Sequence, residues 1–315
     1  MASNIQAIFP PTEKRHRSRH GASGLAVSLN HSPDFIATSL TDSQGLFKES
    51  FALPTLLVLG ALGQGLLSLV LPPRYALLPT VLLLLRAVVL TARELAAPAQ
   101  YAAKLGVVPG SVSAQLPRAS YDPLRPEKAS PFGSTPAEKG VVVFHLGARF
   151  NHPLGPLAPG GKEFGEQFMA CHRELLKRAK EYGCLSGTAF RGDDAASNNT
   201  LLTVYYFRDM DGLTRFARDP VHRQAWDWFR DVFTKKWGYS HFGIFHEAFA
   251  APAGAFETIY LNMPPVLMGT GSADIKNEAT GDDEWVRTLV DASGPIWRTA
   301  HSRMGREVKR QAGES

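Results

Sequence analysis

Hydrophobic residues change their pattern along the chain, from two long apolar blocks to short alternating runs. The first block, Phe51–Leu71, carries no charged residue, and the second, Tyr75–Thr91, follows after a Pro-Pro-Arg break. A helix of about 20 apolar residues is long enough to cross the hydrocarbon core of a bilayer. The pattern therefore predicts a membrane-anchoring helical hairpin over residues 50–92. A helical pair buried in a soluble domain is the alternative.

Basic residues flank this predicted hairpin on both sides. They are Lys14, Arg15, Arg17, Arg19 and Lys48 before it and Arg93 and Lys104 after it. Because the cytoplasmic flanks of membrane helices carry an excess of Lys and Arg, we expect both ends of the hairpin in the cytosol, with the endoplasmic reticulum as the membrane. If the second block only dips into the bilayer, the topology becomes single-pass and this orientation no longer follows.

After residue 140, the apolar positions fit strands and amphipathic helices. Alternating runs predict strands over residues 141–150, 185–190, 201–207 and 239–250. Helical spacing predicts one helix over about 162–182 and another that begins at Asp219-Pro220 and ends at Gly238. The order βαββαβ over residues 140–262 predicts a ferredoxin-like α+β sandwich. Helices on one sheet face leave the other face bare, so we expect two copies to pair into a dimeric α/β barrel.

The other segments lack sustained periodicity. Residues 1–49 are rich in Ser, His and basic residues and are expected to form a disordered arm. Residues 93–139 are rich in Pro, Ser and Ala and are expected to form a linker. Residues 263–315 form a C-terminal extension to which the sequence assigns no function.

Charge and cysteine content change this picture little. The net charge of +5 and the pI near 9.2 arise largely from basic residues at the two ends of the chain. No basic face interleaved with aromatic residues is present in the middle, so we expect membrane lipid rather than nucleic acid as a partner. Cys171 and Cys184 are too few for a disulfide scaffold and indicate free thiols.

Three stretches of the predicted domain resemble a known family. They are HLGARFNHPLG (residues 145–155), TVYYFRDMDGLTRFARDPVHRQAWDWF (203–229) and HFGIFHEAFAAPAGAFETIYLN (241–262). In this order they resemble the fungal antibiotic-biosynthesis-monooxygenase-like proteins of secondary-metabolite clusters, typified by the fumagillin-cluster monooxygenase, over roughly residues 140–270. The resemblance implies a dimeric ferredoxin-like barrel and oxidation of a polyketide or terpenoid intermediate. It transfers no firmly assigned catalytic residues.

The common cofactor motifs are absent from the sequence. There is no GxGxxG after a strand, no phosphate-binding P-loop and no HExxH zinc motif. Oxygenation without flavin or metal is possible for a phenol or enol, because its anion can itself reduce O₂. The protein then needs a base, a dry pocket and groups that stabilise an oxyanion. The expected ligands are therefore a small apolar organic substrate and O₂, with no metal.

Histidine is the natural base near neutral pH. The catalytic candidates are His145, His222 and His241. Candidates for substrate binding, chosen for cationic, amide, phenol, indole and imidazole groups near these histidines, are Arg149, Asn151, Tyr205, Trp226 and His246. A regular final strand places His241 and Glu247 on one face and His246 on the other. For each of these residues, a purely structural role is the alternative interpretation.

The sequence leaves three enzyme classes and one other class open. We favour a membrane-anchored, cofactor-independent monooxygenase. A haem-binding barrel enzyme with a histidine as axial ligand is the first alternative. A non-oxidative cyclase or isomerase on the same fold is the second, because a fold does not determine a function. A non-catalytic membrane scaffold is the remaining possibility.

Overall fold

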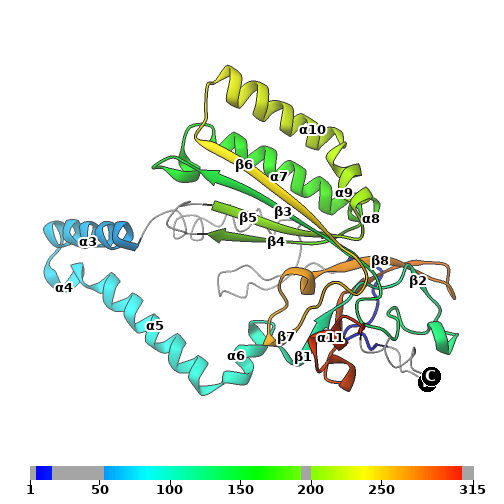
Figure 1. Ribbon diagram of the computed structural model, residues 1–315. Coiled ribbons are helices and arrows are strands. Elements are labelled where there is room, and N and C mark those ends of the chain that lie inside the picture. Colours follow the sequence, from blue (N-terminus) through cyan, green and yellow to red (C-terminus); the bar gives the residue numbers. More distant parts are fainter. Residues whose placement is uncertain (1–4, 16–52, 193–199, 307–315) are drawn as a thin grey trace.

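A computed structural model describes residues 5–15, 53–192 and 200–306. Within them, a four-stranded antiparallel sheet carries a layer of helices on one face (Figure 1). Its strands run in the order β4-β5-β3-β6, the ferredoxin-like order, so the α+β prediction is confirmed. Their bounds are β3 (Val141–Phe150), β4 (Cys184–Gly192), β5 (Thr200–Phe207) and β6 (Phe242–Ala251).

The helices that cover this sheet form a dense aromatic layer. They are α7 (Gly161–Lys177), α8 (Ala179–Tyr182), α9 (Met210–Ala217), α10 (Pro220–Asp227) and η3 (Trp228–Lys236). Asp219 caps α10 by accepting a 2.9 Å hydrogen bond from the Val221 amide, and Pro220 takes the first helical position, as predicted.

The helix predicted to end at Gly238 is α-helical only as far as Asp227 and continues as the π-helix η3. Its wider turn brings the rings of Trp228, Phe233 and Trp237 together, with centroids 5.7–6.3 Å apart. A stretch of π-helix is rare and often lies near a functional site. Gly238 follows with a positive φ of 69°, which a residue without a side chain adopts at little cost, and the chain turns into β6.

A second unit packs against one end of the sheet. One of its sheets joins β1 (Val108–Ala114), β7 (Tyr260–Met263) and β10 (Leu289–Asp291). The other joins β2 (Ser120–Tyr121), β8 (Ser272–Asn277) and β9 (Asp283–Arg287). The segment expected to be a linker thus supplies β1 and β2, and the C-terminal extension supplies β8 to β10. The Pro and Ser content predicted a linker. The scattered apolar residues of this segment, such as Val112, Ala114 and Leu116, are nevertheless buried.

The start of the chain also belongs to this unit. Ala7 bridges to Val290 and Thr12 to Trp285 in antiparallel pairing. The Arg15 guanidinium donates hydrogen bonds to the backbone carbonyls of Leu176 and Leu185. Residues 5–15 therefore connect the second unit to α7 and β4. The rest of the arm predicted to be disordered lies outside the described residues.

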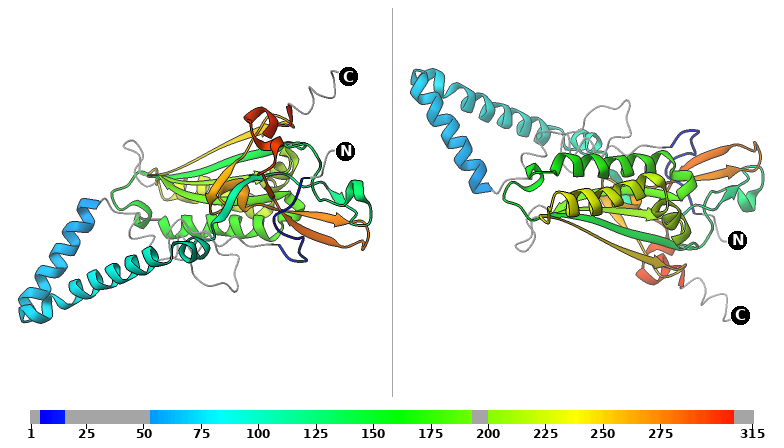
Figure 2. Two further views of the ribbon diagram at one scale, coloured as in Figure 1. Left: turned by 90° about the horizontal axis from the view of Figure 1, so that it is seen from below. Right: turned by 90° about the horizontal axis from the view of Figure 1, so that it is seen from above.

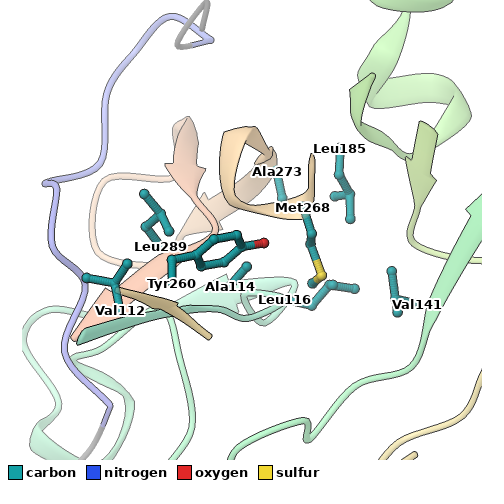
Figure 3. Close-up of a cluster of buried hydrophobic side chains, with 9 residues drawn as sticks. All are labelled: Val112, Ala114, Leu116, Val141, Leu185, Tyr260, Met268, Ala273 and Leu289. Atoms are coloured by element: carbon teal, nitrogen blue, oxygen red, sulfur yellow. The ribbon is translucent and has the colours of Figure 1, made fainter. Parts of the chain in front are cut away.

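One core joins the two units (Figure 3). Tyr260 and Met268 of the second unit pack beside Val141 and Leu185 of the four-stranded sheet. The short helix η4 (Leu267–Thr270) contacts β4 and β5, and the Ser186 hydroxyl donates a 3.3 Å hydrogen bond to the Leu267 carbonyl. The sheet face expected to be bare is therefore covered in part, while the portion over β3 and β6 stays open.

The apolar blocks form helices that extend away from both units (Figures 1 and 2). They are α3 (Leu53–Val70), α4 (Pro73–Ala76) and α5 (Leu78–Ala96), followed by α6 (Pro98–Lys104). Gln64 links them by donating to the Ala76 carbonyl and accepting from the Thr80 hydroxyl. Residues 73–96 form a helix long and apolar enough to cross a membrane, whereas the apolar helix over residues 54–70 is shorter.

Candidate functional site

His222 lies in the first turn of α10, on the helix side of the sheet. Its Nδ1 lies 3.0 Å from the Ala217 carbonyl oxygen, and its ring packs on Phe216. Because a carbonyl can only accept, the neutral imidazole carries its proton on Nδ1, which leaves Nε2 as the basic nitrogen. Burial lowers the pKa of His222, and the nearby His246 adds to this effect, while the hydrogen bond to Ala217 opposes it.

His246 approaches the same region from the edge strand. It lies on the helix-facing side of β6, opposite Leu146, and its ring centroid is 5.7 Å from that of Phe144. Unlike His222, it is exposed to solvent, as is the neighbouring Ala248. His222 and His246 therefore lie on the same, helix side of the sheet, with Phe144 beside His246.

A buried polar pair lies behind Phe144. Tyr205 on β5 is 2% exposed, and its hydroxyl lies 2.8 Å from Nδ1 of His172 on α7. Burial lowers the pKa of His172 to about 4, with contributions from the charges of Arg15 and Arg173. Burial also raises the pKa of Tyr205 well above 10. Both groups are therefore neutral near pH 7, and the Tyr205 ring lies 6.3 Å from Phe144.

His172 was missed by the sequence reasoning. It lies four residues after Phe168 and three before Leu175, which is the spacing of the apolar stripe of α7. Its neighbour Cys171 is only partly buried, whereas His172 is 2% exposed. A polar residue at a core position of an amphipathic helix was the available signal.

The remaining candidates lie elsewhere. His145 and Arg149 project from the opposite, open face of β3, where the His145 Nδ1 is 3.8 Å from a Glu247 carboxylate oxygen. His241 precedes β6, and its Nε2 donates to the Pro159 carbonyl at 2.9 Å. It therefore does not share a site with Glu247.

Two further candidates are exposed and away from the helix-side histidines. Asn151 follows β3, and its backbone amide donates to the His241 carbonyl at 2.7 Å. Trp226 on α10 is 51% exposed and packs on Phe229. A shallow, open groove runs along α10 and η3, but none of the candidate residues lines it. Among the described residues, no three His, Cys, Asp or Glu side chains are grouped as metal ligands would be.

The comparison with known proteins defines the class. A family model described as "Monooxygenase af470-like" matches residues 141–268, which include the whole four-stranded sheet and its helices. The matched region is the part of the chain that forms the four-stranded sheet and the helices on it.

A curated relative extends the match beyond that domain. "Monooxygenase af470" of Aspergillus fumigatus is 37% identical over 259 residues, which cover 82% of this chain and 89% of the relative. The chain therefore belongs to the af470-like monooxygenase family, and it is an enzyme. The family expected from the three motifs is confirmed.

Solved structures resemble parts of the chain more distantly. A variant of SnoaB, a cofactor-independent oxygenase from Streptomyces nogalater, is 18% identical, with a TM-score of 0.24, and the match covers 35% of this chain and 90% of SnoaB. An aldoxime dehydratase in complex with butyraldoxime is also 18% identical, with a TM-score of 0.33 and 42% and 37% coverage. At such low identities and scores, neither likeness supports a statement about activity.

Proposed function

We propose that this monooxygenase oxidises an apolar polyketide or terpenoid intermediate that carries a phenol or an enolisable ketone, and that it uses neither flavin nor metal. The observation that carries the proposal is the state of His222. Its Nδ1 is fixed by Ala217, its pKa is lowered by burial, and its Nε2 is the basic atom. A base that stays neutral at physiological pH and lies beside an aromatic ring suits the deprotonation of a flat organic substrate.

The proposed reaction needs only substrate and O₂. His222 removes a proton from the substrate carbon acid, and the resulting anion gives one electron to O₂. The substrate radical and superoxide then combine into a peroxide anion, which takes up the proton. Loss of water from this hydroperoxide leaves a carbonyl, so that R₂CH₂ and O₂ become R₂C=O and H₂O. His246, which is exposed at the same site, supplies a hydrogen bond to the developing oxyanion.

Attachment to a membrane forms the second part of the proposal. The leucines and valines of α3 and α5 are largely exposed, among them Leu57, Leu66, Leu83 and Leu84. An exposed apolar surface of this size is typical of a segment that contacts lipid. Basic residues on both flanks favour the endoplasmic reticulum membrane with the catalytic domain in the cytosol. Apolar substrates partition into the bilayer, so attachment would place the enzyme where they are concentrated.

A second copy of the chain is the proposed partner for the open part of the sheet. Phe245 and Phe249 on β6 are 42% and 53% exposed, beside His145 on β3. Gly147 lets the Phe245 ring lie flat on β3, since a Cβ there would be 2.0 Å from that ring. Two such faces could pack against each other, but η4 limits the contact to the region of β3 and β6.

The test uses the full chain in lipid nanodiscs with an enolisable tricyclic ketone as the probe substrate. Under ¹⁸O₂, we expect one ¹⁸O atom in the product, with equal consumption of O₂ and ketone, in preparations that contain a chelator and lack flavin or haem absorbance. A Soret band that tracks activity would favour the haem enzyme. Conversion without O₂ consumption would favour the cyclase or isomerase. Either result would contradict the proposed mechanism.

A further inference from the structure

The core between α7 and the sheet contains polar atoms that the chemistry at His222 does not use. The Nε2 atom of His172 and the Oγ1 atom of Thr203 are both buried, and neither has a hydrogen-bond partner among the described residues. Thr203 precedes Tyr205 by two positions on β5, so both side chains face the helix side. Two unpaired polar atoms therefore occur in the same layer as the His172–Tyr205 pair.

An unpaired polar atom in a protein core is costly. Leaving a buried donor or acceptor unsatisfied destabilises a fold by about 1–3 kcal/mol. The orientation of His172 is nevertheless well determined, because Tyr205 holds its Nδ1 at 2.8 Å. Tyr205 is itself seated against β4, where a Cβ at Gly187 would lie 2.6 Å from the ring. The pair thus presents Nε2 in a fixed direction.

Phe144 lies next to both Tyr205 and the exposed His246. Its ring centroid lies 6.3 Å from that of Tyr205 on the inner side and 5.7 Å from that of His246 on the outer side. The residue opposite Phe144 on the edge strand is Ala248, which is small and exposed. A change of the Phe144 rotamer toward Ala248 therefore meets only a small side chain at that position of β6. This movement would uncover the ring of Tyr205, whose hydroxyl lies 2.8 Å from His172 Nδ1.

We propose that His172 and Tyr205 form the inner end of a substrate site that Phe144 closes when no substrate is bound. His172 Nε2 forms a hydrogen bond with the phenolic or enolic oxygen of a planar apolar ligand, whose ring system takes the place of the Phe144 side chain. The inference rests on the proposed function for the class of ligand. It adds the residue that selects for an oxygen substituent and the side chain that controls access.

Anaerobic binding tests this inference separately from turnover. The probes are 2-naphthol and naphthalene, which differ only in the hydroxyl group, titrated against the full chain in nanodiscs, with empty nanodiscs subtracted. A neutral hydrogen bond corresponds to about a tenfold difference in Kd. We expect the wild-type protein to bind 2-naphthol about tenfold more tightly than naphthalene, and His172→Phe to remove this preference while it retains affinity for naphthalene.

Further variants address folding and gating. His172→Phe replaces one planar ring by another and removes the unpaired Nε2, but it leaves the buried Tyr205 hydroxyl without its partner. The double variant His172→Phe/Tyr205→Phe removes both polar groups and is the folding control, and its thermal unfolding temperature should not fall. Phe144→Ala should accelerate association of both probes, and the exposed His301→Phe is the matched control that should leave both Kd values unchanged. An equal hydroxyl preference in wild type and His172→Phe would overturn the inference, and is also the result expected if Nε2 only holds a buried water. Loss of the preference in a protein that shows no oxygenation would sustain the inference and contradict the proposed function instead.

Discussion

The two faces of the four-stranded sheet carry the same residue types in opposite environments. On the helix side, His222 and His172 are desolvated, and each has its Nδ1 fixed by a neighbour at 3.0 or 2.8 Å. On the open face, the His145 side chain is 33% exposed and Glu247 is 63% exposed, and their closest atoms are 3.8 Å apart. The helix side thus has fixed, neutral imidazoles, whereas the open face has a loosely paired histidine among exposed phenylalanines.

This difference separates chemistry from association. A base acts efficiently when its protonation state and direction are set before the substrate arrives. The helix side meets that requirement at His222, while the open face offers exposed rings at Phe245 and Phe249, as an interface does. We therefore propose that one face serves catalysis and the other serves pairing of two copies. The following predictions, ordered from the largest effect to the smallest, can break this assignment.

The largest expected effect is on turnover. His222→Ala removes the proposed base, so kcat should fall by about 10²–10⁴-fold, the usual contribution of general base catalysis. His145→Ala, a histidine substitution on the opposite face, should change kcat less than twofold in the same oxygen-uptake assay. Circular dichroism spectra of both variants control for folding. If the two losses were reversed in size, the open face would be the catalytic one.

The next effect is on the stability of the helix that carries His222. Asp219 accepts hydrogen bonds from Arg178 at 2.6 Å and from Tyr182 at 2.7 Å, in addition to capping α10. Asp219→Ala leaves a buried hydroxyl and a guanidinium without this partner, which should lower the free energy of unfolding by about 3 kcal/mol. Urea titration measures the loss. Asp231→Ala removes exposed ion pairs with Arg230 and Lys235 and serves as the control, with an unchanged midpoint.

A third effect appears in the pH dependence of stability. The pKa of His172 is about 4 in the folded chain against 6.5 for an ordinary histidine. The unfolded chain therefore takes up a proton first, and stability is lost as pH falls from 6.5 to 4, by about 3 kcal/mol from this residue. The free energy of unfolding, measured with urea at both pH values, should therefore fall by about 3 kcal/mol less in His172→Phe than in the wild type. An identical pH profile in both proteins would show that His172 is not held neutral by the core.

Much of this architecture was predictable from the sequence, whereas the site was predictable only in part. Alternation and helical spacing identified the sheet, and Asp219-Pro220 located the start of α10. Composition misled over residues 93–139, because a Pro-rich segment can still supply β1 when strands from distant parts of the chain cover it. Tertiary packing, which sequence periodicity does not contain, decides that His241 bonds to Pro159 and that the backbone carbonyl of Ala217 fixes His222.

A smaller effect concerns association through the open face. Phe249 is 53% exposed and packs beside His145. If two copies pair here, Phe249→Asp introduces a charge into the contact and should weaken dimerisation by about 2 kcal/mol, roughly a thirtyfold increase in Kd. Sedimentation in detergent measures the change. Leu124→Asp, at a residue that is 80% exposed in the second unit, is the control and should leave the dimer intact.

The smallest effect is expected for the pair His145 and Glu247 itself. Their separation of 3.8 Å is too long for a hydrogen bond, and both side chains contact solvent. A double-mutant cycle with His145→Ala and Glu247→Gln, measured in the Phe249→Asp background, should therefore give a coupling energy below about 0.5 kcal/mol. The same cycle without Phe249→Asp should give a larger value if a second copy covers the pair, because removal of solvent strengthens the interaction between opposite charges. A strong coupling in both backgrounds would mean that the open face holds a fixed imidazole–carboxylate pair of its own. The proposal that the helix side serves catalysis and the open face serves pairing would then be wrong.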